Sequence, residues 1–519
     1  MSFDADTLFG LLPAVHRIRD AEIAASSGGL LTDEETAELT ALLALPAPTV
    51  AEQERMRLLG RKATTGSLRA VLTVLAGEIA VVEENLAQLH DDLFIETCAD
   101  WVVPYIGDLL GSEPLHPVGR SAGWARAEVA HTIAMRRRKG TAAVLEQLAR
   151  DVTGWDARAV EFFRLLATTQ HMNHVRPGNA TAALRDGESV QWAGSAFDPL
   201  PHTADVRRIE SGRGRYNIPN VGLFLWRIGA HRLRRSPVTP HNPSDPADRR
   251  FRFSPLGNDV PLHTNPEPED EITHIAEPGN VPLPITRRLL ARHPSRYHGA
   301  GRSLELFVGG TPVPADQIVT CNLSDDGAQW AHDAPADRVA VDPELGRMVV
   351  GSAVAVSGTV RATFHYGAAA DLGGGEYERA ATFEPATGDV VRVPDDHAAI
   401  QDALDALAGS GTVEITDNGR YREAVVIHAG QDRTVELRAA PGRRPTLELT
   451  APMTLTGDDG GGISVNGLVI AGGALVVPAA DNALRRLGLV HTTLVPGRTL
   501  DAGGTAALPG EPSLSVERP

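Results

Sequence analysis

Cysteine, lysine and aromatic residues are scarce in this chain of 519 residues, in which aromatic side chains make up 5%. The two cysteines, Cys98 and Cys321, lie far apart and in different expected domains. A disulfide framework is therefore not expected, and synthesis in a reducing cytoplasm fits this usage. Lysine occurs only at Lys62 and Lys139, so arginine carries nearly all of the positive charge.

The sequence also has no run of about 18 apolar residues, the length that a membrane-spanning helix needs. Its first residues, MSFDADTLFGLLPAVHRIRD, lack the basic segment and long apolar stretch of a signal peptide. We therefore expect cytoplasmic synthesis and assembly, without a signal peptide and without membrane insertion.

Acidic residues outnumber basic ones, so the formal net charge is -17. Such a chain repels polyanions on average, so DNA or RNA binding would need a concentrated basic patch. The one candidate run is 136–139, and four basic residues at a helix end are typical of a solvated or intersubunit contact. No nucleic-acid partner is predicted.

The length is too great for one hydrophobic core, and the pattern predicts a multidomain α+β protein. We expect an N-terminal helical part with a long coiled-coil-like helix, central β-rich domains and a C-terminal right-handed parallel β-helix. The expected segments are 1–66 (helical), 67–95 (long heptad helix), 96–184 (helical docking domain), 185–300 (irregular, β-rich, with long loops), 301–380 (small β domain) and 390–519 (β-helix with a capping helix at 396–408).

The clearest periodicity lies in the long helix, which Ser67 is placed to cap. Apolar residues recur there at alternating spacings of four and three, which is the seam of a coiled coil. The seam consists of Leu68, Leu72, Leu75, Ile79, Val82, Leu86, Leu89 and Leu93. Val71, Val74 and Val81 widen it, which favours a bundle of three or more helices with partners from other chains. The alternative is a core helix packed within its own domain.

Short strands dominate the second half. Strands are expected at 221–226 and 251–253, and period-2 patterns predict further strands at 304–308, 338–341 and 360–366. After position 390 the strands become shorter and closer, at 413–415, 425–427, 435–437, 447–449, 463–465, 468–470, 475–477 and 487–489. An amphipathic helix before them presents Ile400, Ala403, Leu404 and Leu407. This arrangement favours a β-helix, with a β-sandwich as the alternative. Residues 513–517 resemble the first strand of another coil.

Two stretches carry a resemblance to a known family, and four shorter matches follow them. The stretches are ETCADWVVPYIGDLLG at 96–111 and RRRKGTAAVLEQLARDVTGW at 136–155. The shorter matches are QHMNHVRP (170–177), GRYNIPN (214–220), FSPLGN (253–258) and DLGGGEY (371–377). Together they resemble the tail protein I family of contractile phages, and more closely its larger relatives in extracellular contractile injection systems.

The resemblance implies a structural baseplate wedge subunit that links the baseplate to the sheath and tube. It implies a heterotrimeric helical bundle with a second wedge protein, contacts with neighbouring wedges, and sheath and hub proteins as further candidate partners. The implied docking motif comprises Trp101, Pro104, Tyr105, Gly107, Asp108, Lys139, Gly140, Thr141, Gly154 and Trp155.

Catalytic signatures are weak. His171 and His174 have the spacing of two metal ligands on a helix, but no third ligand accompanies them convincingly. The glycine runs 373–375 and 460–462 precede no Lys-Ser or Lys-Thr pair and indicate flexible loops. We predict no catalytic residue, metal or cofactor. The alternative function is a carbohydrate-binding or carbohydrate-cleaving β-helix, for which the available carboxylates are Asp417, Glu423, Asp432, Asp458 and Asp459.

Overall fold

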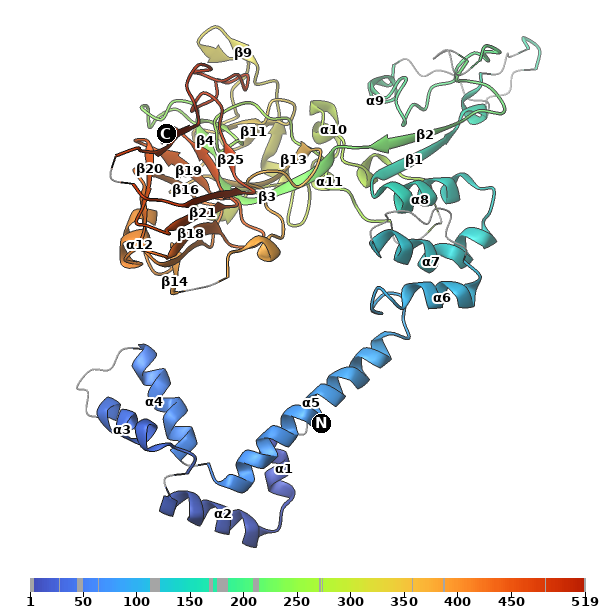
Figure 1. The fold of residues 1–519 in the computed structure, drawn as a ribbon. Coiled ribbons are helices and arrows are strands. Elements are labelled where there is room, and N and C mark those ends of the chain that lie inside the picture. The colour runs from blue at the N-terminus through green and yellow to red at the C-terminus, as the bar shows by residue number, and fades with distance from the viewer. Residues whose placement is uncertain are drawn as a thin grey trace. The chain divides into compact units, whose positions relative to one another are not determined.

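The computed structural model describes residues 4–27, 29–43, 50–63, 65–112, 122–167, 171–174, 185–208, 214–269, 272, 274–356, 358–385, 388–480 and 482–517. The chain divides into two compact units, residues 1–138 and 139–519. The fold is mixed α+β: the described part of the first unit is helical, and strands dominate the second (Figure 1).

The first unit contains seven helices among its described residues. They are α1 (Ala5–Leu11), α2 (Ala14–Ser27), α3 (Asp33–Leu43), α4 (Val50–Ala63), α5 (Ser67–Asp91), α6 (Val103–Leu110) and α7 (Ala122–Arg137). Ion pairs between Glu38 and Arg55 and between Glu35 and Lys62 join α3 to α4. Among the described helices no single one is long and apolar enough to cross a bilayer. The helical segments Arg55–Ala63 and Ser67–Asp91 meet the criterion of length and composition only when they are taken together, and the bend between them is 116°.

The second unit begins with a small α/β layer. Helix α8 (Ala142–Thr153) packs on a two-stranded antiparallel ribbon of β1 (Asp156–Glu161) and β2 (Val221–Trp226). The buried Glu146 carboxylate of α8 accepts the backbone N–H groups of Ala159 and Ala276, each at 2.8 Å. Because β1 and β2 pair across position 184, the expected boundary at 184/185 is wrong.

The central β domain is built from two main sheets, of order β4-β5-β12-β11-β8 and β3-β13-β6-β7. Its strands are β3 (Gly229–Pro237), β4 (Thr239–Pro240), β5 (Arg250–Arg252), β6 (Leu304–Val308), β7 (Thr311–Pro312), β8 (Ile318–Thr320), β9 (Asp325–Asp326), β10 (Gln329–Trp330), β11 (Val339–Asp342), β12 (Arg347–Val350) and β13 (Arg361–Ala368). The short helices α9 (Gly187–Gln191), α10 (Arg287–Arg292) and α11 (Pro294–Tyr297) accompany them.

The expected division into 185–300 and 301–380 is also wrong. Strand β3 pairs with β13, and β5 pairs with β12, so both main sheets contain strands from either side of position 300. One hydrophobic core runs from Leu233 to Phe364. The two segments therefore form one domain.

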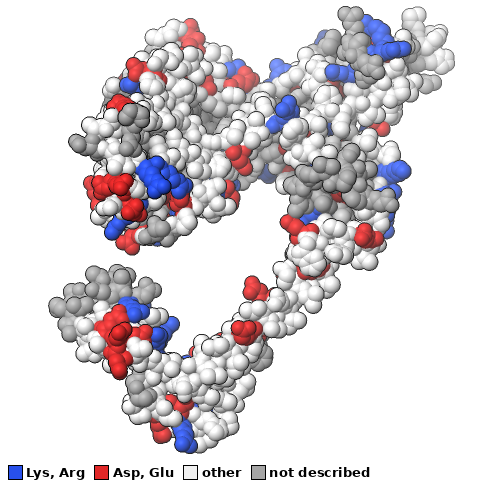
Figure 2. Space-filling view, in the orientation of Figure 1, with Lys and Arg blue, Asp and Glu red and all other residues white. Residues whose placement is uncertain are grey.

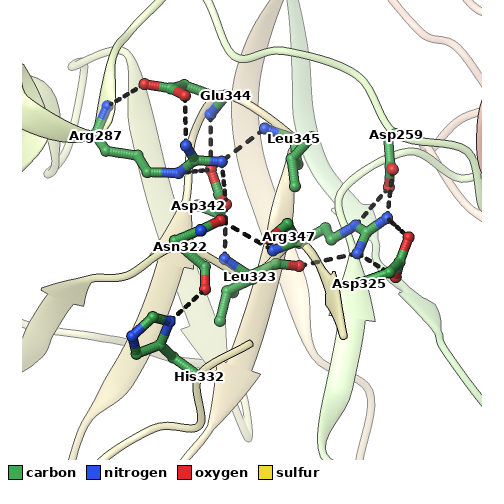
Figure 3. A network of polar contacts seen from close by, with 11 residues as sticks. Asp259, Arg287, Asn322, Leu323, Asp325, His332, Asp342, Glu344, Leu345 and Arg347 are labelled. Carbon is green, nitrogen blue, oxygen red and sulfur yellow. Dashed lines mark hydrogen bonds and ion pairs between the residues drawn. The ribbon is translucent and has the colours of Figure 1, made fainter. Parts of the chain in front are cut away.

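A polar network ties the central domain together at one end of β11 and β12 (Figure 3). The buried Arg347 guanidinium binds Asp259 and Asp325, which lowers the pKa of the Asp325 carboxyl. The buried Asp342 carboxylate binds Arg287 and accepts the Leu323 N–H. Breaking a buried pair of this kind leaves an uncompensated charge, so these contacts fix the loops before β9 and β12.

The C-terminal segment is a β-solenoid, as predicted. Three parallel sheets run along it, of order β14-β15-β18-β21-β24, β16-β19-β22-β25 and β17-β20-β23-β26. The strands are β14 (Val390–Val393), β15 (Gly411–Ile415), β16 (Arg420–Glu423), β17 (Val426–Ala429), β18 (Thr434–Ala439), β19 (Thr446–Leu449), β20 (Met453–Gly457), β21 (Gly462–Asn466), β22 (Val469–Ala471), β23 (Leu475–Val477), β24 (Arg486–Val490), β25 (Thr493–Leu494) and β26 (Leu514–Val516). Because every pairing in these sheets is parallel, the β-sandwich alternative is excluded.

Aliphatic side chains stack in register inside the solenoid. Val413, Leu437, Val465 and Leu489 lie directly above one another in successive coils. Helix α12 (Ile400–Ala406) covers the first coil with the four side chains predicted for it, Ile400, Ala403, Leu404 and Leu407, all of them buried. Strand β26 pairs with β23 as the third strand of its coil. The prediction that residues 513–517 open a further coil is therefore wrong.

The glycine run 373–375 is not a flexible loop. A Cβ at Gly374 would lie 2.6 Å from the Leu468 carbonyl carbon, so only glycine permits this approach to the solenoid. The nearby Arg379, almost fully buried, donates to the Arg443 carbonyl at 2.8 Å. This segment joins the central domain to the solenoid.

Candidate interaction surface

The start of α5 is fixed by a residue far away in the sequence. Asp20, a buried residue of α2, accepts the backbone N–H groups of Leu68 at 2.9 Å and Arg69 at 3.2 Å. These are donors that a helix cannot satisfy internally at its first turn. The N-cap position is Gly66, where a Cβ would lie 2.2 Å from an Asp20 carboxylate oxygen. Ser67 is thus the first helical residue, and the prediction that its side chain caps the helix is wrong.

One flank of α5 is packed against the N-terminal helices. Arg69 forms an ion pair with Asp6 of α1, and its guanidinium lies 5.5 Å from the centre of the Phe9 ring. Ala76 is the only buried residue of α5. The N-terminal helices therefore hold α5 along one narrow flank and leave its aliphatic seam uncovered.

The predicted seam is exposed to solvent. Six of its side chains are between 36% and 71% exposed, namely Leu68, Leu75, Val82, Leu86, Leu89 and Leu93, while Leu72 and Ile79 are half-buried. Leu93 lies just beyond the last residue of α5, Asp91. Since none of the eight is buried, the alternative of a helix enclosed in its own domain does not describe α5.

The exposed face is wider than the seam. Val71, Val74 and Val81 are also more than half exposed. At 100° per residue, Val74 and Val81 mark one border of this face, and Leu72 marks the other, roughly half of the circumference away. Glu78 and Asn85 are polar positions inside this arc, near its Val74 border. Figure 2 shows α5 as a mostly uncharged rod with a few carboxylates. We name the eight seam residues with Val71, Val74 and Val81 the α5 ridge.

Aromatic residues extend the exposed surface after α5. Trp101 and Tyr105 are 68% and 65% exposed and meet edge to face, with ring centres 6.1 Å apart. Pro104 and Asp108 are exposed beside them, whereas Gly107 is buried, and a Cβ there would lie 3.2 Å from Val129. Arg126 of α7 fixes this region by donating to the carbonyls of Ile95 and Cys98.

The remaining docking residues belong to the second unit. Gly140 and Gly154 have φ of +90° and +70°, and Gly154 ends α8. Thr141 is the N-cap of α8, Lys139 is exposed, and the Arg227 guanidinium lies 5.4 Å from the Trp155 ring centre. The division after Arg138 therefore splits both the predicted docking motif and the predicted 96–184 domain.

A second apolar row, on β2, was missed from the sequence. Val221, Leu223 and Leu225 are exposed, while Phe224 and Trp226 pack against the core around Phe197. The six-residue strand is apolar throughout, so its composition gave no sign of which side faces water.

The candidate carboxylates of the solenoid hold local structure. Glu423 accepts the N–H groups of Ile400 and Gln401 and so caps α12. Asp417 accepts the Tyr421 hydroxyl, and burial together with this carboxylate raises the tyrosine pKa. An Asp458 carboxylate oxygen lies 3.6 Å from His428 Nε2. The backbone carbonyl of Asp459 accepts the Asp432 N–H, and the Asp432 side chain lies against Gly460.

His171 and His174 lie with ring centres 5.6 Å apart in a short β-bridge, not on a helix. Within the described ranges, no group of three or more metal-ligating side chains converges. The metal site that their spacing offered is therefore not formed by the residues that the structure describes.

Comparison with known proteins finds no matching family model, no similar curated protein and no similar solved structure. The fold defines this chain as a mixed α+β protein with a helical unit and a β-solenoid.

Proposed function

We propose that this chain is a structural wedge subunit of the baseplate of a contractile, phage-tail-like injection system. The observation that carries the proposal is the α5 ridge, a long aliphatic surface that the described residues of its own unit leave exposed. The sequence resemblance supplies the kind of assembly, and the ridge supplies the contact through which the subunit would join it.

The energetics favour partner helices along this ridge. Full burial of a leucine or valine side chain is worth about 1.5 to 3 kcal/mol, so covering a half-exposed one contributes roughly 1 kcal/mol. Association costs about 4 to 15 kcal/mol in lost freedom. One partner helix that covers only part of the ridge would barely offset this cost. Two partner helices would cover the whole half-circumference, so the width of the ridge, and not the energy sum, favours the heterotrimeric bundle over a simple pair.

Other exposed surfaces would complete the assembly. Trp101 and Tyr105 follow the ridge along the chain and are suited to the same bundle, because aromatic side chains are enriched where interfaces bury most energy. The β2 row offers a separate contact for a neighbouring wedge. The solenoid would lie at the periphery, and sheath or hub proteins would be reached through these contacts.

A double substitution tests the proposal in the native host. Leu75→Asp with Leu86→Asp places two charges on the ridge, and we expect sheathed particles to disappear from sedimented, imaged preparations. The matched control is Ala80→Asp with Ala87→Asp, two exposed positions on the other side of the same helix, which should leave particles intact.

Circular dichroism of the purified variants separates misfolding from lost assembly, since substitutions at exposed ridge positions should preserve the helical signal. Normal particles from the ridge variant, with this chain incorporated, would rule out the wedge role of α5.

A further inference from the structure

A cavity of about 320 Å³ lies on the outward face of the sheet β3-β13-β6-β7. Seven of its lining residues come from three neighbouring strands: Arg232, Arg234 and Arg235 from β3, Thr363 and His365 from β13, and Glu305 and Phe307 from β6. The opposite face of the same strands carries the core residues Leu233, Phe364 and Leu306. A volume of this size is at the lower end for small-ligand sites.

A β-bulge gathers the three arginines. Ala362 pairs with Ser236 and Phe364 pairs with Leu233, so Arg234 and Arg235 together face the single residue Thr363. In a regular strand, successive side chains alternate between faces, and Arg234 and Arg235 would point apart. The extra residue removes that alternation, and Arg232, Arg234 and Arg235 all reach the cavity.

Arg235 holds an unfavourable backbone conformation at this bulge. Its φ is +47°, a region that L-residues other than glycine rarely adopt. The backbone N–H donates to the Thr363 hydroxyl at 3.0 Å, and the guanidinium lies 4.5 Å from the Phe307 ring centre. Strained residues and bulges concentrate at functional sites, where they aim a side chain. Here the strain aims a guanidinium into the cavity.

The neighbouring arginines are held in place but remain accessible. Arg232 and Arg234 both bind Glu376, a carboxylate with a side chain only 1% exposed, while their own side chains are 48% and 44% exposed. Arg302 pairs with Glu267 at 2.6 Å and is 46% exposed. Each guanidinium has five N–H donors, so one carboxylate partner leaves donors directed at solvent. The four arginines outnumber the three nearby carboxylates, those of Glu267, Glu305 and Glu376.

We propose that this cavity binds an oxyanion, a carboxylate or phosphate group, through Arg235 and the open edges of Arg232, Arg234 and Arg302. The planar guanidinium fork matches both anions, and charge-assisted hydrogen bonds to it are about twice as strong as neutral ones. The oxyanion could come from a free phosphate-type ligand or from acidic side chains of another protein. The proposal is independent of the wedge function.

Calorimetric titration of the full chain at low salt tests it, with inorganic phosphate and a tetraglutamate peptide as probes. We expect saturable binding of at least one probe below about 10 mM. Arg235→Gln should weaken that binding about tenfold, as expected for the loss of a charged donor. Glu305→Gln should strengthen it several-fold, because it removes a repelling carboxylate from the lining.

Tighter binding by the Glu305→Gln variant would show that its cavity is correctly folded, since a misfolded site does not gain affinity. Arg422→Gln, at an exposed solenoid arginine paired with Glu448, is the matched control and should leave binding unchanged. Binding of phosphate alone would identify a free ligand, and binding of the peptide would identify an acidic protein segment. No saturable binding of either probe, or binding that ignores both cavity substitutions, would overturn the proposal.

Discussion

Helix α5 and the solenoid are both rich in leucine, valine and isoleucine, but they place these residues in opposite environments. In the solenoid such side chains point inward and stack coil on coil, as Val413, Leu437 and Val465 do. In α5 they form a ridge of which no member is buried. The solenoid is thus stabilised by its own interior, whereas the ridge gains stability only when something else covers it.

The comparison predicts very different losses of stability when one leucine is truncated to alanine in each of the two regions. Leu437→Ala should lower the free energy of unfolding by about 2 to 5 kcal/mol, because it opens a cavity in a closed core. Leu86→Ala should change it by less than about 0.5 kcal/mol, because that side chain is already in water. Chemical denaturation of the isolated chain measures both, and equal losses would mean that the ridge is covered in solution.

Lowering the pH should have a smaller effect on the free energy of unfolding, and this effect should be confined to the second unit. Burial lowers the pKa of His298 from 6.5 to about 4, and its Nε2 accepts the Leu306 N–H at 3.3 Å. The folded state therefore binds the proton less readily than the unfolded state. The contribution of neutral His298 to the free energy of unfolding is therefore complete above pH 6.5. It declines as the pH falls toward 4, by about 3 kcal/mol in all.

Denaturation series at several pH values check this sign. Burial also lowers the pKa values of His263 and His365, which adds to the same trend. His298→Gln keeps an acceptor but cannot titrate, so its stability should depend less on pH between 6.5 and 4. A variant with the unchanged slope would show that His298 is not the group responsible.

A smaller loss of stability than that of Leu437→Ala is expected at the start of α5, in the first unit. Asp20→Ala removes the cap of α5 and should cost about 0.5 to 2 kcal/mol. The loss should appear as reduced helical ellipticity on mild heating. Glu22→Ala, at an exposed position on the same helix α2, is the control. If both variants melt alike, the Asp20 contact does not hold the helix start.

Local patterns made much of the fold predictable. The solenoid strands, helix α12 with its four buried residues and the helical extent of α5 follow from periodicities of 2.0 and 3.6 residues, which neighbouring residues alone determine. The need of the seam for partner helices was predicted for a different reason, since little else nearby in the sequence could cover so long a stripe.

What the sequence did not reveal depends on contacts between distant residues. The pairing of β3 with β13 joins positions more than a hundred residues apart, so the boundary at 300 was misplaced. Asp20 reaches α5 from another helix, and no spacing rule links it to Leu68. The bulge at Arg235 exists only because Thr363 faces two residues, which the single strand cannot show.

The capped start of α5 also has a mechanical consequence. A helix of 25 residues is about 37 Å long, and its start is held by the Asp20 carboxylate of α2 and by the contacts of Arg69 with α1. A sideways displacement of α5 near Leu86 would therefore rotate the helix about its fixed start. This rotation would also move the N-terminal helices that hold that start, and with them any protein bound to those helices.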